Sequence, residues 1–260
     1  MTTMTDYVHA LATIDPVGIA TLAIRNAGSL NILSTPVIQD LTQALKELGR
    51  IERIRTLIIR GSGDKAFVAG ADINEMATLD RNSAVTFIKG LRDLCETTRM
   101  FPTPVIARIP GWCLGGGLEF AMACDVRIAA TGTQFGMPEV KIGLPSVIHA
   151  ALMPRLIGGA HASWLLLSGE NINTEQALRW GLISEIVHLA ELDQRIMTIA
   201  SAFAALGPNV LKQQKTLLRR WEHLSLPEAI ADSVQEFGQA FETGEPQQFM
   251  NAFLAQKSRK

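Results

Sequence analysis

The sequence predicts an α/β protein with mostly parallel strands, followed by a region made of helices alone. Short segments rich in β-branched residues alternate with amphipathic segments of helical period in the first part of the chain. Strands separated by helices or long connections are typical of parallel sheets. Towards the C-terminus only the helical period remains. We therefore expect an α/β core over residues 1–190 and a helical region over residues 191–260.

The elements of the first half follow from local patterns. Residues 17–25 (VGIATLAIR) alternate apolar and polar positions, which predicts a strand. Pro36 fits the first turn of a helix, and an apolar face continues from it to Leu48. In chain order, the further predicted elements are strands over 55–60 and 66–69, a helix over 83–100, a strand over 105–109, a helix over 118–124 and a strand over 125–130.

The second half reads as a series of helices. Pro208 and Pro227 each mark a first helical turn, and the segments after them are amphipathic. No serine- or glycine-rich linker separates this part from the core, so we expect it to pack on the core or on a neighbouring subunit. The predicted helices cover 149–156, 160–167, 174–180, 192–206, 208–221, 227–241 and 246–256.

Composition excludes several classes of protein. The chain has 260 residues, of which 47% are hydrophobic and 19% charged, so it is long and apolar enough to build a core without disulfides or metals. The net charge of −1 argues against a nucleic-acid partner. The three cysteines lack metal-binding spacing, and their odd number favours buried thiols in a reducing compartment. With no leader or membrane-length apolar run in view, we expect a cytoplasmic protein with no membrane association.

Two glycine-containing segments follow predicted strands. Residues 69–73 (AGADI) come after one strand, and residues 115–119 (GGGLE) come after another and open a helix. Glycine lets the backbone approach a ligand closely, and a helix start leaves N–H donors unpaired. Such turns can aim two N–H groups at one developing oxyanion. The alternative is that both segments are ordinary strand-to-helix turns.

Two glutamates lie in apolar surroundings. Glu119 begins the apolar helix segment LEFAMA, and Glu139 lies in the segment MPEV. A carboxylate in such company costs free energy unless it has a partner or a chemical role. Two carboxylates with raised pKa values that face one pocket can act as acid and base. The alternative is a buried salt bridge or a helix cap for each.

Other residues are weaker candidates. Ser146 and His149 lie three residues apart without the GxSxG turn of a serine hydrolase, so we interpret them as a structural pair. A basic helix cluster is expected to form a solvated face, and the four tryptophans are expected to fill the core. No dinucleotide or P-loop glycine motif occurs. The basic cluster consists of Lys212, Lys215, Arg219 and Arg220.

An ordered set of short segments resembles one known family. Each segment is weak alone, but the set spans nearly the whole chain and places Glu119 and Glu139 20 residues apart. The chain resembles the enoyl-CoA hydratase/isomerase family, also called the crotonase superfamily. The matching segments are residues 24–25, 31, 65–73 (KAFVAGADI), 104–107 (PVIA), 111–119 (GWCLGGGLE), 123–125 (ACD), 135–139 (FGMPE), 165–167, 169 and 177–183 (ALRWGLI).

The resemblance implies a fold and a reaction. The fold is a spiral of ββα units with a C-terminal helical trimerisation region, and the reaction is hydration of a 2-enoyl-CoA in fatty acid metabolism. The N–H groups of Ala71 and Gly116 would hold the thioester carbonyl in an oxyanion hole. Glu119 would hold and deprotonate water, and Glu139 would deliver the proton to Cα.

The resemblance also implies binding residues and partners. Coenzyme A is part of the substrate, and no metal or redox cofactor is implied. A homotrimer or a dimer of trimers is expected, in which a lysine near the C-terminus, here Lys257, reaches the CoA phosphate of a neighbouring subunit. The implied substrate-binding residues are Arg25, Ala69, Asp72, Ile73, Trp112, Gly115, Gly117, Pro138, Phe253 and Lys257.

The chain departs from the family pattern at three points, and one of them lies near the C-terminus, where Gln256 stands at a position at which a lysine is expected. Asn26 stands where a proline commonly follows the first arginine, close to the expected site of the CoA adenine. The segment 143–149 (GLPSVIH) replaces a glycine-rich stretch and should reshape the acyl pocket. Acyl-chain length, branching, pathway, and trimer against hexamer are not readable from the sequence.

Three alternative activities stay open beside the hydratase. An acyl-CoA hydrolase uses the same oxyanion hole, and the changed segment from Ser146 to His149 keeps that alternative open. Family isomerases usually keep one of the two acids, whereas this chain has both. Some relatives bind RNA or act as scaffolds, which the net charge and the two retained glutamates disfavour.

Overall fold

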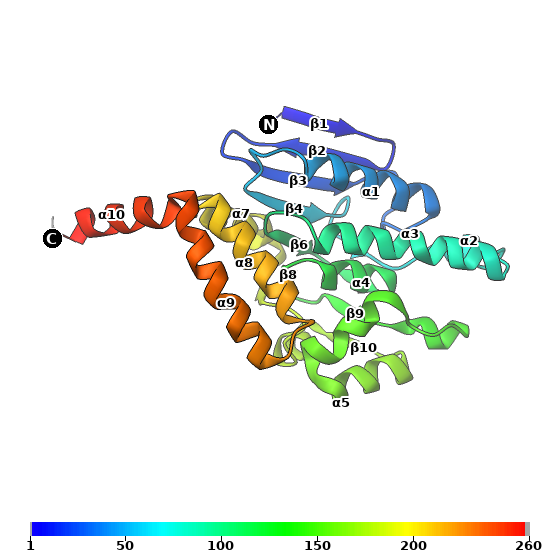
Figure 1. Cartoon of the computed structure of the whole chain (residues 1–260). Coiled ribbons are helices and arrows are strands. Elements are labelled where there is room, and N and C mark those ends of the chain that lie inside the picture. The colour runs from blue at the N-terminus through cyan, green and yellow to red at the C-terminus, as the bar shows by residue number, and fades with distance from the viewer. Residues whose placement is uncertain (1, 258–260) are drawn as a thin grey trace.

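Seven strands form the main sheet of the computed structural model, which describes residues 2–257 (Figure 1). The first three strands are antiparallel, and the rest run parallel to β3. The central strands β4 and β6 are buried on both faces, as continuous apolar strands of parallel sheets are. In spatial order the strands are β1 (Thr2–Asp6), β2 (Ala10–Ile14), β3 (Ile19–Ile24), β4 (Thr56–Arg60), β6 (Val105–Ile109), β8 (Val126–Ala130) and β11 (Glu185–Val187).

A second sheet of four short strands carries the turns that lead to the pocket. Three of its strands pair in parallel, and β10 joins antiparallel at the edge. These strands bury Phe67 and Phe135 completely, so the sheet is anchored in the core. Its order is β10 (Asn171–Asn173), β9 (Gln134–Gly136), β7 (Trp112–Leu114) and β5 (Ala66–Val68).

Helices from the first half build the core between the two sheets. Apolar residues of α1 (Thr35–Leu48), α3 (Arg81–Arg99) and α4 (Gly116–Ala123) join one cluster with strands of both sheets. All eight residues of α4 are buried. The short helix α2 (Ile73–Met76) lies between β5 and α3 in the sequence.

The helix α7 (Leu192–Ala204) covers the opposite face of the main sheet. Its buried residues Leu192, Ile196 and Ala200 pack on Ile58 and Ile106 of the central strands. The first helix of the predicted C-terminal region therefore takes part in packing around the sheet. The division into residues 1–190 and 191–260 stays a prediction.

The C-terminal helices extend away from the sheets. Figure 1 shows α9 along α8, and α10 projecting from the body. Leu226, Ile230, Val234 and Phe237 on α9 leave between 61% and 74% of their surface exposed. The remaining helices are α5 (Met153–Ser168), α6 (Thr174–Arg179), α8 (Pro208–Trp221), α9 (Leu226–Ala240), α10 (Glu245–Lys257) and the 3₁₀ turns η1 (Pro138–Ile142), η2 (Ile148–Leu152), η3 (Leu189–Glu191) and η4 (Phe241–Thr243).

The predicted α/β class is confirmed, with differences in detail. The predicted helices occur, although residues 149–156 divide between η2 and the start of α5. The strands β1, β2, β7, β9, β10 and β11 were not predicted, and four of them have only three residues. Within residues 2–257 no helix is both long and apolar enough to cross a bilayer.

The basic cluster on α8 is not the solvated face that the sequence suggested. Lys215 is 7% exposed and its Nζ lies 2.6 Å from a carboxylate oxygen of Asp125. Arg219 bonds the other oxygen of Asp125 at 2.6 Å, and Arg220 pairs with acids of α9. Only Lys212 is exposed. The cluster therefore holds α8 against the core through Asp125 and against α9 through Asp232 and Glu236.

The tryptophans differ from the expected burial, whereas the cysteines agree with it. The tryptophans do not fill the core: Trp112, Trp164 and Trp221 are at least 36% exposed, and Trp180 is half-buried. The three cysteines are buried free thiols, as expected. Burial raises the pKa of the Cys124 thiol to about 12 and raises those of the other two as well.

Candidate active site

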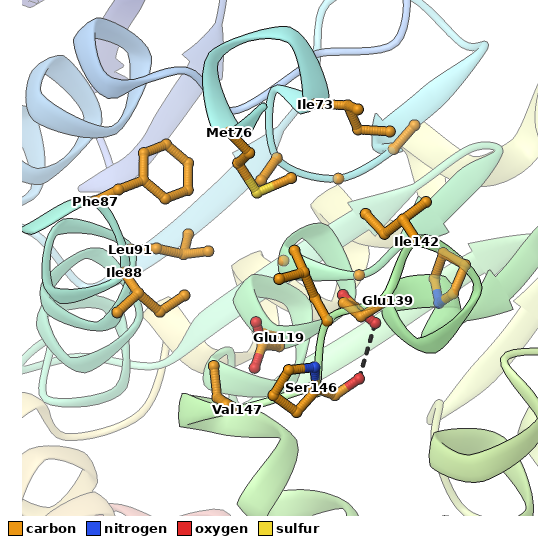
Figure 2. Close-up of a pocket in the computed structure, with 18 residues that line it drawn as sticks. Ile73, Met76, Phe87, Ile88, Leu91, Glu119, Glu139, Ile142, Ser146 and Val147 are labelled. Atoms are coloured by element: carbon orange, nitrogen blue, oxygen red, sulfur yellow. Dashed lines mark hydrogen bonds between the residues drawn. The ribbon is translucent and has the colours of Figure 1, made fainter. Parts of the chain in front are cut away.

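An apolar pocket lies where the turns after β5 and β7 meet α3 and the segment after η1. Its cavity volume is about 120 Å³, and both predicted glutamates line it. Figure 2 shows Glu119 and Glu139 in the pocket, with Phe87, Ile88 and Leu91 of α3 along one wall. The lining residues are Ala69, Gly70, Ala71, Ile73, Met76, Phe87, Ile88, Leu91, Gly115, Gly116, Glu119, Pro138, Glu139, Ile142, Leu144, Pro145, Ser146 and Val147.

The turn after β5 is held by backbone bonds to Leu33. The N–H of Leu33 donates to the carbonyl of Gly70 at 3.0 Å, and its carbonyl accepts the N–H of Asp72 at 3.1 Å. Gly70 has a φ of +119°, which a side chain would disfavour. Asp72 then caps α2, accepting the N–H groups of Asn74 and Glu75. This pattern leaves Ala71 between two anchored residues.

The turn after β7 needs glycine for steric reasons. Gly115 has a φ of +52°, and a Cβ there would lie 2.5 Å from Oε1 of Glu139. A Cβ on Gly117 would lie 2.2 Å from the carbonyl oxygen of Val68. Both distances are too short for an alanine without movement of the backbone or of Glu139. The glycine run therefore brings β5, α4 and Glu139 close together.

Several N–H groups of these two turns are bonded within the protein, and the two predicted oxyanion donors are not among them. The N–H of Gly115 donates to Gly136, and those of Leu118 and Glu119 donate to Gly115. In residues 2–257, the N–H groups of Ala71 and Gly116 have no acceptor in the protein. Both residues line the pocket. The predicted pair of oxyanion donors is thus free of protein partners, as an oxyanion hole requires.

Glu119 is a buried carboxyl with one backbone donor. It is 3% exposed, and its Oε1 accepts the N–H of Ala150 at 2.9 Å. Burial, together with the charge of Glu139, raises the pKa of Glu119 to about 8 against the opposing effect of the backbone N–H groups of Ala150 and His149. Glu119 therefore holds a proton at neutral pH and can act as an acid.

Glu139 is held by a side-chain donor. The hydroxyl of Ser146 donates to Oε2 of Glu139 at 2.8 Å, the bond drawn in Figure 2. Burial raises the pKa of Glu139 above its usual range, while its own backbone N–H and Ser146 favour the ionised form. The two carboxyls share one pocket and differ in their surroundings, which is the arrangement that separates an acid from a base.

Part of the predicted binding set lies outside this pocket. Ala69, Ile73, Gly115 and Pro138 line it, whereas Gly117 packs against β5. Asp72 is used as a helix cap. The exposed residues lie apart from the pocket within one chain: Trp112 on β7, and Phe253 and Lys257 on α10.

Arg25 and Asn26 form a loop beside β1 that is also outside the pocket. Arg25 donates to the carbonyl of Tyr7 and pairs with Asp6. Asn26 has a φ of +53° and donates through Nδ2 to the carbonyl of Val8 at 2.7 Å. Proline is locked near −65° and cannot adopt this conformation. The backbone of this loop at Asn26 is therefore one that the proline of the family pattern could not adopt.

Ser146 and His149 are not a pair. The hydroxyl of Ser146 bonds Glu139, whereas Nε2 of His149 lies 2.9 Å from Oε1 of Glu96 on α3. The intervening Ile148 has a φ of +40°, and this bend directs the two side chains to different carboxylates. The sequence singled out both residues but gave no signal for these partners, which lie 7 and 53 residues away.

The arrangement supports chemistry that begins at a carbonyl. Two free N–H groups can hold an oxygen that becomes negative, and two carboxyls can exchange protons with atoms beside it. Within the described part of the chain, no cluster of histidine, cysteine or acidic residues has the arrangement of a metal site.

Comparisons with known proteins point to one family. The sequence model of the enoyl-CoA hydratase/isomerase family matches residues 15–260. The chain is 31% identical to a short-chain-enoyl-CoA hydratase of Clostridium acetobutylicum, with 92% of each chain covered. It is 36% identical to a probable enoyl-CoA hydratase of Mycobacterium tuberculosis, with 93% of each covered.

Solved structures agree with the sequence comparisons. An enoyl-CoA hydratase from Bacillus anthracis superposes with a TM-score of 0.89 at 27% identity, over 98% of this chain and 96% of that one. The Pseudomonas aeruginosa protein DspI superposes with a TM-score of 0.92 at 28% identity, over 97% and 96%.

Proposed function

This chain belongs to the enoyl-CoA hydratase/isomerase family, and from that premise we propose that it adds water across the double bond of a 2-enoyl-CoA thioester. One observation carries the proposal: two carboxyl groups and two unpaired N–H groups line the same apolar pocket. Hydration needs all four groups, because water must be activated, a carbon protonated and an enolate oxygen held.

The N–H groups of Ala71 and Gly116 bind the thioester oxygen in this proposal. As water attacks Cβ, the electrons of the double bond move toward the carbonyl and form an enolate. The two donors stabilise its negative oxygen, and losing one such donor typically costs about 3–4 kcal/mol of barrier. The apolar walls from α2 and α3 exclude bulk water and strengthen these bonds.

The glutamates move the protons. Following the family resemblance, Glu119 takes a proton from water as the oxygen bonds to Cβ, and Glu139 gives its proton to Cα. The pair carries one proton throughout, on Glu139 before hydration and on Glu119 after it. The resting state with protonated Glu119 is therefore the state that starts dehydration, and hydration starts once this proton has moved to Glu139. In dehydration Glu139 takes the Cα proton and Glu119 returns its proton to the leaving hydroxyl. General acid–base catalysis of this kind contributes about 10²–10⁴ in rate.

Binding and assembly are further parts of the proposal. We propose that coenzyme A is bound as part of the substrate, with no metal or redox cofactor, because the four protein groups supply the chemistry. The exposed apolar side chains of α9 and α10 support a homotrimer or dimer of trimers, in which Phe253 and Lys257 reach a neighbouring subunit. The cytoplasmic location and the absence of a nucleic-acid partner stay predictions.

A turnover assay on the purified full-length protein tests the proposal. Loss of the conjugated enoyl thioester absorbance is followed with crotonyl-CoA and longer 2-enoyl-CoAs, while free thiol is measured in parallel. We expect loss of conjugation without thiol, reduced at least about 100-fold by Glu119→Gln or Glu139→Gln. The exposed Glu52→Gln is the matched control and should retain full activity. Thiol release would indicate a hydrolase, and no turnover of any substrate would refute the hydratase.

A further inference from the structure

One short segment contacts both carboxyl groups of the proposed acid–base pair. At its start, the hydroxyl of Ser146 donates to Oε2 of Glu139 at 2.8 Å. At its end, the N–H of Ala150 donates to Oε1 of Glu119 at 2.9 Å. Between them, His149 is 5% exposed and fastens the segment to Glu96 of α3. The segment therefore has a fixed position relative to both acids.

The two oxygens of Glu139 have different surroundings. Oε2 accepts the Ser146 hydroxyl, whereas Oε1 lies against the Gly115 turn, where an added Cβ would approach it to 2.5 Å. The turn at Gly115 leads directly to the free N–H of Gly116. Oε1 is thus the oxygen of Glu139 beside the proposed oxyanion hole.

We propose, resting on the hydratase function above, that Ser146 is a positioning residue that holds Glu139 as the ionised member of the pair and leaves Oε1 as its working oxygen. A hydroxyl donor stabilises a carboxylate more than it stabilises a carboxylic acid in the same geometry, because a hydrogen bond to a charged acceptor is the stronger one. The proton of a singly protonated pair then resides on the more deeply buried Glu119.

The neighbouring charges agree with this distribution. Burial raises the pKa of Glu119 on α4, and the charge of Glu139 adds to this rise. Lys141 of η1 pairs with Glu170, and His149 of η2 pairs with Glu96, so each has its own carboxylate partner. Ser146 is the side-chain donor to Glu139.

A nucleophilic role for Ser146 is the main rival. Glu139 could in principle take the Ser146 proton, and acyl transfer to Oγ would release the CoA thiol. The imidazole that usually activates a serine is directed elsewhere, because His149 bonds Glu96. The two roles differ in outcome: a nucleophile is indispensable and releases thiol, whereas a positioning donor alters the titration of Glu139.

The test compares pH profiles of kcat/KM in wild type, Ser146→Ala and Ser146→Thr. Removing the hydroxyl should move the acid limb upward by about one pH unit, the equivalent of losing one bond to a charged group. The alkaline limb should stay in place, because Glu139 is ionised on both sides of that second step. Measured for dehydration of a 3-hydroxyacyl-CoA, the direction that uses ionised Glu139 as base, kcat at the optimum should fall roughly tenfold with little change in KM. Threonine keeps the hydroxyl and should restore the wild-type limb.

A matched control and an independent readout complete the test. Ser201→Ala removes an exposed hydroxyl on α7 and should change neither limb. In a Glu119→Gln background, the infrared absorption of protonated Glu139 is isolated by subtracting the spectrum of the same protein with Glu139→Gln and is followed against pH. In Ser146→Ala this absorption should persist to higher pH. The measurement needs no substrate, so it judges Ser146 even where hydratase activity is absent.

Each outcome decides between the roles. A shifted acid limb together with a shifted infrared titration, at an unchanged melting temperature, supports the proposal. Profiles that are merely lowered, with the infrared titration unmoved, would overturn it. Complete loss of turnover in both Ser146→Ala and Ser146→Thr, with thiol release by wild type, would overturn it in favour of a nucleophile. An inactive wild type with a shifted infrared titration would refute the hydratase and keep the Ser146–Glu139 assignment.

Discussion

Replacing Glu119 by glutamine should remove catalysis and at the same time stabilise the protein at alkaline pH. Glutamine has nearly the same shape, and its oxygen can still accept the N–H of Ala150 that now bonds Glu119. It carries no charge to be desolvated in the pocket. The substitution therefore measures how much the ionised carboxylate of Glu119, which is only 3% exposed, lowers the free energy of unfolding.

The magnitude follows from the pKa of Glu119. Burial raises that pKa to about 8 from its ordinary value of 4.5, which we take for the unfolded chain. Between these values the folded state binds more protons than the unfolded state, so the free energy of unfolding falls as pH rises. The full gap corresponds to about 5 kcal/mol, of which about 3.5 kcal/mol is lost between about pH 5.5 and about pH 8.5.

Urea unfolding at these two pH values measures the effect. Tryptophan fluorescence is followed at one fixed protein concentration, because an oligomer would make stability depend on concentration. Wild type should lose about 3.5 kcal/mol more than Glu119→Gln over this pH interval. Contributions from groups that do not interact with Glu119 cancel in this comparison, and Glu52→Gln, at an exposed position, should follow wild type.

Parallel pH dependences would refute the reasoning. If wild type and Glu119→Gln differ by the same free energy at both pH values, Glu119 titrates alike in the folded and unfolded chain. Its carboxyl would then be hydrated, and the pocket would not be the dry site from which its acid role was argued. A difference that grows in the opposite direction would mean that Glu119 is stabilised as the anion.

Three further predictions concern the turn at Gly115, the acyl pocket and the ion pair that joins Lys215 of α8 to Asp125. Gly115→Ala should lower kcat at least about 100-fold, because the added Cβ would displace Glu139. It should also lower the free energy of unfolding by about 1–2 kcal/mol, because the φ of Gly115 is positive. Near-normal turnover of this variant would contradict the prediction. The cavity of about 120 Å³ is smaller than the roughly 150 Å³ that accepts benzene in another protein, so short acyl chains should be preferred. Met76→Ala should raise kcat/KM for eight-carbon relative to four-carbon 2-enoyl-CoAs about tenfold, and an unchanged ratio would count against a pocket-size limit. Asp125→Ala should lower the free energy of unfolding, measured with urea, by about 3–5 kcal/mol, because it leaves the buried ammonium group of Lys215 without its carboxylate. Lys215→Met leaves no unpaired buried cation and should lower the free energy of unfolding clearly less. Equal losses in the two variants would contradict this explanation.

The helices were predictable from the sequence where a local signal marks their start. Pro36 and Pro208 lie in the first turns of α1 and α8, as expected from the fixed φ of proline. The short strands of the second sheet were not predictable, because three residues give no period to detect. Those strands exist because neighbours in space complete them, and the sequence of one strand does not reveal its neighbours.

In the candidate site, too, features with a local sequence signal were predictable, and features that depend on distant contacts were not. The glycine turns and both glutamates were found because their residue types are unusual in apolar local surroundings. The partner of Ser146 and the burial of Lys215 were not found, since each depends on where the chain returns. Lys215 meets Asp125 across 90 residues, and a charged position on an amphipathic helix looks solvated until that partner is known. The family assignment succeeded because an ordered set of segments carries information that no single segment has.

The buried thiols have a consequence for an enzyme that handles thioesters. Cys95, Cys113 and Cys124 are at most 2% exposed, and burial raises the pKa of each, so almost no thiolate is present at neutral pH. Thiol–disulfide exchange requires an accessible thiolate. The folded protein is therefore inert toward oxidised coenzyme A and glutathione, and it contributes little background to a thiol-specific dye. The parallel thiol measurement can consequently be read directly on the native protein, and a rising dye signal without substrate would report unfolding.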